Sequence, residues 1–184
     1  MKISRMVFKL AFILMIVGGC ASPDSSQSRH FDSLSIRGTP QFDEQVEKAL
    51  TLLKTQSPAG YAIVTNYIGI VQQYEHSGME VHHNPPIFQL NTNSAYVSVT
   101  WCAGVIAHDS FHSKFYFEYK KQHPWAIRVP DDIYSGEQAE RACSEHQMSV
   151  LKDIGAPASE VDWCRQCETQ TNQYWKVKYQ NRNW

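Results

Sequence analysis

The chain has 184 residues, of which 42% are hydrophobic, and its 17 basic residues nearly balance 18 acidic ones. This balance, without a basic stripe, excludes a typical nucleic-acid-binding protein, which concentrates lysine and arginine on one face. No internal repeat or second linker is evident, so we expect a single domain over residues 39–184.

The first 19 residues have the pattern of a secretory signal. Lys2, Arg5 and Lys9 precede or adjoin an apolar run over residues 10–17, and no acid lies among them. The run is shorter than the roughly 20 apolar residues that a membrane-spanning helix needs. We therefore expect residues 1–19 to act as a cleaved leader.

The leader ends in Val-Gly-Gly-Cys, which resembles the lipobox of bacterial lipoproteins. The resemblance implies that Cys20 is acylated and anchors the protein in a membrane. It also implies the outer membrane, facing the periplasm, because Ala21 stands where Asp would favour the inner membrane. The mature chain has 14 basic and 18 acidic residues, a net charge of −4. We expect residues 20–38, which are poor in apolar residues, to be the lipidated N-terminus and a flexible tether.

The first half of the domain predicts one helix and a small sheet. Apolar residues recur at helical spacing over residues 42–54, with acids early in the segment. Residues 61–74 are rich in β-branched and aromatic side chains and predict one or two strands, with a turn at 76–78. Residues 86–90 and 95–100 predict further short strands.

From residue 101 the apolar spacing becomes helical. The pattern predicts three helices, over residues 101–121, 135–154 and 159–178, the first ended by His123-Pro124. An N-terminal helix, a small β-sheet and three helices make an α+β domain.

Four cysteines remain in the mature chain: Cys102, Cys143, Cys164 and Cys167. In an exported protein an even number predicts two disulfides, with three possible pairings. Cys164-x-x-Cys167 is also compatible with a redox pair or half of a zinc knuckle. Structural disulfides are favoured, because the chain has no second C-x-x-C and no βαβ pattern around this one.

The most informative stretch is His108-Asp109-Ser110-Phe111-His112. Its two histidines are four residues apart, so they lie one turn apart on the same face of the predicted helix, in the middle of its apolar side. Each could be a core histidine bonded to backbone. Two stacked imidazoles, however, have four donor and acceptor positions to satisfy away from water. A metal ion satisfies both rings, so the pattern predicts metal ligation.

The next helix offers two acids as a third ligand. Cys143 marks its buried side, and at 100° per residue Glu140 lies about 60° from it while Glu137 lies about 120° away. We therefore expect Glu140 to be the third ligand, with Glu137 in reserve. The alternative for Glu140 is a partly buried ion pair with Arg128 or Arg141.

The arrangement resembles the gluzincin type of zinc metallopeptidase over residues 96–154, where a helix carries H-E-x-x-H and a later helix supplies a Glu. The resemblance implies a Zn²⁺ ion held by His108, His112 and Glu140, and water activated with the help of the acid at position 109. Here that acid is Asp109, whose side chain is one methylene shorter than that of Glu.

Two functions are compatible with this sequence. The first is a lipid-anchored zinc hydrolase acting on a peptide or protein, with Asp109 as the base and Tyr116 and Tyr134 as candidate oxyanion donors. The second is a non-catalytic envelope lipoprotein, with a structural metal site or no metal, acting by protein–protein contact. The shorter side chain of Asp109 leaves this choice open, since proton transfer requires close approach.

Overall fold

The computed structural model describes the backbone of residues 28–170 and the side chains of residues 28–166. The predicted leader, Cys20 and the first part of the predicted tether lie outside the described residues. Within residues 28–170, no helix combines the length and the apolar character needed to cross a bilayer.

A five-stranded mixed sheet forms one layer of the domain. Its strands have the spatial order β1-β2-β3-β5-β4. β2 and β3 pair in parallel, as do β3 and β5, whereas β1 and β4 join the edges in antiparallel pairs. The strands are β1 (Arg29–Phe31), β2 (Leu34–Arg37), β3 (Ile70–Tyr74), β4 (Gly78–Glu80) and β5 (Ile87–Asn91).

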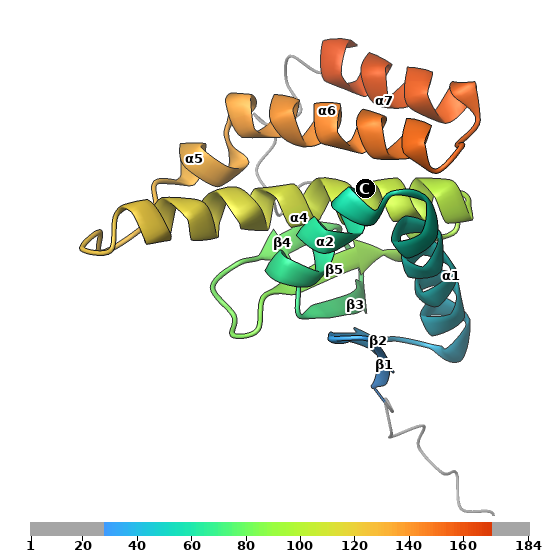
Figure 1. Ribbon diagram of the computed structural model, residues 1–184, viewed down its shortest axis with the longest axis horizontal. Helices are drawn as coiled ribbons and strands as arrows, with labels where there is room; N and C mark the ends of the chain where they lie inside the picture. Colours follow the sequence, from blue (N-terminus) through green and yellow to red (C-terminus); the bar gives the residue numbers. More distant parts are fainter. Residues whose placement is uncertain (1–27, 171–184) are drawn as a thin grey trace, which may run out of the picture.

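Helices cover the sheet, with the longest of them in the centre. α4 lies between the sheet and α6, and α7 lies on the far side of α6 (Figure 1). α1 and α2 pack against α4 as well. The helices are α1 (Pro40–Gln56), α2 (Pro58–Tyr67), α3 (Thr92–Ala95), α4 (Val99–Gln122), α5 (Asp131–Ser135), α6 (Glu137–Asp153) and α7 (Ala158–Gln170).

Local sequence fixes where α4 begins, and packing fixes its distance from α6. The Ser98 hydroxyl accepts a hydrogen bond from the Trp101 backbone N–H at 2.8 Å, a normal N-cap. Gly104 then faces α6, where an added Cβ would lie 2.8 Å from Cδ2 of Leu151. The two helices therefore approach closely because position 104 has no side chain.

The α+β class is confirmed. The helices predicted over residues 42–54 and 101–121 correspond to α1 and α4. The helix predicted over 135–154 is mostly α6, preceded by the separate short helix α5. The helix predicted over 159–178 is present as α7 up to Gln170, and its remainder lies outside the described residues.

Two strand predictions were wrong. Most of the predicted strand segment over residues 61–74 is helix, because α2 extends to Tyr67 and only Ile70–Tyr74 is a strand. Residues 95–100 end α3 and begin α4 instead of forming a strand. β-branched and aromatic content is a weak signal that packing overrides, and here both segments pack on other helices.

The predicted tether is shorter than expected, since β1 and β2 belong to the sheet. Leu34 and Ile36 are fully buried and alternate with more exposed residues. The free energy gained by burying these two large apolar side chains is enough to hold the segment in the sheet, although most of its residues are polar.

Candidate metal centre

The site is built on α4 and α6, the two helices that lie side by side in the centre of the domain (Figure 1). His108 and His112 both lie on α4, one turn apart. Their Nε2 atoms approach to 3.1 Å. Both rings turn toward α6, because Glu140 of that helix contacts each of them.

Glu140 is the acid that the structure brings to the two histidines. Its Oε2 lies 3.4 Å from Nε2 of His108 and 3.5 Å from Nε2 of His112. The Glu140 side chain is only 6% exposed. Glu137 does not reach the cluster: its side chain is 52% exposed and forms an ion pair with Arg141 at 3.1 Å.

Two of these three distances fall within the edge lengths of a zinc coordination tetrahedron, and the third is about 0.2 Å shorter. Zinc bonds to histidine nitrogen and carboxylate oxygen are about 2.0–2.2 Å long, so neighbouring ligand atoms lie about 3.3–3.5 Å apart. The observed separations are 3.1, 3.4 and 3.5 Å. The three donor atoms are therefore already spaced for a small divalent ion.

Cys143 is a further donor at the same place. Its sulfur and the ring nitrogens of His108 and His112 all lie within 4.8 Å of one another, and this cluster could hold a metal ion. The sequence alone predicted a disulfide for Cys143. Its position, one turn after Glu140 on the same helix, is the signal that identifies it as a candidate ligand.

No disulfide joins any two of Cys102, Cys143 and Cys164, the three cysteines whose side chains the structure describes. All three are buried, and the side chain of Cys167 lies outside the described residues. Two bridges among four cysteines would need at least one between the first three. Burial raises the pKa of the Cys102 thiol to about 12, which makes it inert.

A backbone carbonyl orients His112 for ligation. Its Nδ1 lies 2.6 Å from the carbonyl oxygen of Tyr134, so Nδ1 carries the proton and donates it. In the neutral ring, Nε2 then has the lone pair, and it faces His108, Glu140 and Cys143. Metal-binding histidines are commonly held by such a second hydrogen bond. Nδ1 of His108 is buried and has no hydrogen-bond partner among residues 28–166.

The donors are electrostatically coupled. Burial favours a higher pKa for Glu140, but the charges and hydrogen bonds of His112 and His108 outweigh it and hold that pKa well below its ordinary value. Burial favours a lower pKa for His112, but Cys143 and Glu140 outweigh it and raise that pKa well above its ordinary value. Without a metal, a protonated imidazole therefore balances the carboxylate, and a cation can replace that proton.

Asp109 lies beside the cluster. It is buried on α4, and its charge is one of the influences that raise the pKa of Cys143, after the larger effect of burial. The two candidate oxyanion donors have other partners: the Tyr116 hydroxyl lies 3.1 Å from Nδ1 of His82, and the Tyr134 hydroxyl lies 3.5 Å from Asp131.

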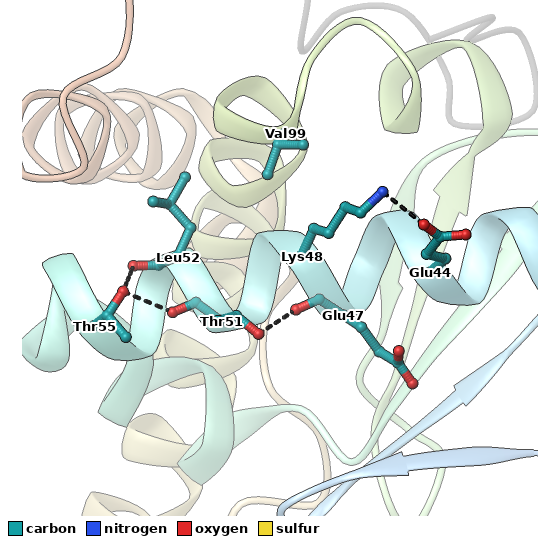
Figure 2. A pocket seen from close by; sticks show the side chains of 7 residues that line it. All are labelled: Glu44, Glu47, Lys48, Thr51, Leu52, Thr55 and Val99. Carbon is teal, nitrogen blue, oxygen red and sulfur yellow. Dashed lines mark hydrogen bonds and ion pairs between the residues drawn. The ribbon is translucent and has the colours of Figure 1, made fainter.

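An open depression elsewhere contains none of the predicted site residues. It lies along α1, and Figure 2 shows the side chains that line it, among them Lys48 and Glu44, which form an ion pair at 2.7 Å. Val99, at the start of α4, closes one side of it.

Comparisons with protein-family models, with curated protein sequences and with solved structures found no significant match.

Proposed function

We propose that this protein is a lipid-anchored cell-envelope zinc hydrolase that acts on peptides or proteins. The observation that carries the proposal is the triad of His108, His112 and Glu140, whose donor atoms lie 3.1–3.5 Å apart in a buried site. Nitrogen and oxygen donors at these distances suit zinc, and zinc sites with three protein ligands are typically catalytic.

Each side chain has a distinct role in this proposal. When bound, zinc would supply a Lewis acid that activates water and polarises a carbonyl. The imidazoles and Glu140 hold the ion, and the Tyr134 carbonyl keeps His112 in the ligating tautomer. Asp109 is the proton acceptor, because it follows His108 directly on α4 and lies near the donor cluster.

The buried position of Asp109 supports this role despite its length. Asp109 lies on the same helix as His108 and His112, so the helix fixes its position relative to both imidazoles. Burial also strengthens its interaction with a nearby positive charge, since the local dielectric is lower than that of water.

The location of the protein in the cell is a separate part of the proposal. The basic leader and the lipobox-like ending at Cys20 support export and acylation, which would place the domain at the periplasmic face of the outer membrane. Labelled palmitate should enter the wild-type chain and not the Cys20→Ser variant. Equal labelling of both would refute the anchor without affecting the metal site.

The enzymatic part is tested by metal content and turnover together. The full chain should contain about one zinc per molecule by elemental analysis, and Glu140→Gln should lose most of it. Glu137→Gln is the matched control, because it removes an exposed acid from the same helix.

Asp109→Asn should keep the zinc and lose most hydrolysis of a broad peptide library, whereas Asp109→Glu should retain it. If neither substitution changes turnover, Asp109 is not the base. If zinc is present and no variant or wild type cleaves anything, the non-catalytic envelope lipoprotein with a structural metal site is the correct function.

A further inference from the structure

The donor triad accounts for three ligands, and zinc in proteins usually has four. The fourth position decides whether such a site is open to water. Cys143 is the side chain in the cluster that the proposed hydrolase does not use.

Helix geometry places Cys143 with the other donors. It lies three residues after Glu140 on α6, so both side chains project from the same face of that helix toward α4. α4 contributes two donors four residues apart, and α6 contributes two donors three residues apart. The two imidazoles thus face both candidate donors of α6: Oε2 of Glu140 lies 3.4 and 3.5 Å from their Nε2 atoms, and the Cys143 sulfur lies within 4.8 Å of a ring nitrogen of each.

The distances are compatible with ligation by sulfur. In a zinc tetrahedron, a sulfur ligand lies about 3.6 Å from a nitrogen ligand, given bonds of about 2.3 and 2.05 Å. The Cys143 sulfur is within 4.8 Å of both ring nitrogens. The sulfur therefore has to approach each ring nitrogen by at most about 1.2 Å to reach the spacing of two zinc ligands.

Burial and charge favour the same assignment. Cys143 is fully buried, and its sulfur lies within 4.8 Å of a ring nitrogen of His112. A thiolate and the Glu140 carboxylate together carry two negative charges, which balance a divalent cation bound by two neutral imidazoles. A buried site with balanced charge avoids most of the desolvation penalty of an isolated ion.

We propose that Cys143 is the fourth ligand of the bound metal and that it keeps the site closed to water. This inference rests on the proposed function, because it describes a resting state of the same centre. In a four-coordinate zinc site, a sulfur ligand takes the one position that three protein ligands leave open to water. The protein as folded is then a latent hydrolase with low but measurable turnover, because water reaches the metal only when the thiolate leaves the fourth coordination position.

The first test reads ligation by sulfur independently of turnover. The full chain is loaded with Co²⁺ in place of zinc, and its near-ultraviolet absorption is recorded. The wild type should show a thiolate-to-cobalt charge-transfer band that is absent from Cys143→Ala and Cys143→Ser. Cys102→Ala, which removes another fully buried thiol, should keep the band.

Affinity and turnover complete the test. Cys143→Ser should bind zinc at least about tenfold more weakly, since even the loss of an outer-shell partner costs 10–100-fold. At saturating zinc, Cys143→Ala should cleave peptides several-fold faster than the wild type.

A wild-type cobalt protein without the band overturns ligation by Cys143. Unchanged turnover in Cys143→Ala, when the band is lost, overturns latency. These results differ from a failure of the proposed function, in which Glu140→Gln and wild type would bind equal amounts of metal, or Asp109→Asn would cleave as fast as wild type.

Discussion

The charge pair between Glu140 and the two histidines should stabilise the metal-free fold. We consider Glu140→Gln, which keeps the size of the side chain and removes its charge. Oε2 lies 3.5 Å from Nε2 of His112, and the two side chains are 6% and 9% exposed. At an effective dielectric constant of about 20, one charged imidazole at that distance attracts the carboxylate by about 5 kcal/mol.

Desolvation offsets part of this attraction, and the substitution leaves a protonated imidazole without its counter-ion. Breaking a buried pair by removing one partner costs about 3–5 kcal/mol. Because glutamine retains one acceptor oxygen, we expect Glu140→Gln to lose about 3 kcal/mol. Glu137→Gln, which breaks an exposed pair with Arg141, should lose no more than about 1 kcal/mol.

The effect has a defined pH dependence. The pKa of Glu140 is lowered in the folded state, so its contribution is present above its unfolded value of 4.5 and is lost as the pH falls toward the folded value. The pKa of His112 is raised, so its contribution is complete below its unfolded value of 6.5 and is lost as the pH rises through the folded value. The loss of stability caused by Glu140→Gln should therefore be greatest between pH 4.5 and pH 6.5, the two unfolded pKa values.

The assay is urea unfolding in the presence of a chelator, for both variants and wild type, at several pH values from 3 to 9. The midpoint and slope give the free energy of unfolding. If Glu140→Gln loses no more stability than Glu137→Gln at pH 5.5, no buried charge pair forms between the helices. The electrostatic account of the metal-free site would then be wrong.

Three further perturbations test the site and its support. Zinc at a hundredfold excess over its dissociation constant should raise the free energy of unfolding of the wild type by about 2.7 kcal/mol; thermal melts of His112→Ala should show no such increase. Gly104→Ala should lower stability by about 1–2 kcal/mol in urea and weaken zinc binding, since its new Cβ meets Leu151 across the α4–α6 contact. Ser98→Ala should lose about 1–2 kcal/mol in the same assay, because Ser98 caps α4 and also donates a 2.7 Å hydrogen bond to Glu160. A wild-type response to zinc in His112→Ala, or wild-type stability in the other two, would contradict these assignments.

The helices that carry the candidate site were predictable because their signals are local. Periodic apolar residues and the turn at His123-Pro124 delimit α4, and these depend only on neighbouring residues. α1 follows the same logic, with Thr39 as its N-cap and Pro40 in its first turn. In α1, the face that the apolar spacing predicts to be buried is the face that packs against the rest of the domain.

The first two strands and α2 were missed because their structure depends on distant partners. β2 lies between β1 and β3, so Leu34 and Ile36 are buried by residues far along the chain. α2 buries only Gly60 and Val64, and its apolar content gave no helical stripe. In both cases a short segment takes its conformation from the surface that covers it.

The same division holds for the metal centre. Two imidazoles one turn apart, and an inward acid on the following helix, are readable from spacing alone. The hydrogen bond between His112 and the Tyr134 carbonyl could not be predicted from the sequence. It forms only because the short helix α5 packs against α4 and brings its backbone to His112. A backbone carbonyl that orients a candidate metal ligand can belong to any residue type, so the amino-acid sequence does not indicate it.

For Cys143, the direction of the side chain was predicted correctly, whereas the predicted disulfide does not join it to Cys102 or Cys164. Its buried direction was the reference by which Glu140 was chosen over Glu137, and that direction holds in the structure. Its chemistry was inferred from the compartment, where an even number of cysteines favours disulfides. A residue that points to the same place as a metal ligand is itself within reach of the metal. For a buried cysteine one turn from such a ligand, position on the helix is therefore stronger grounds for assignment than cysteine count.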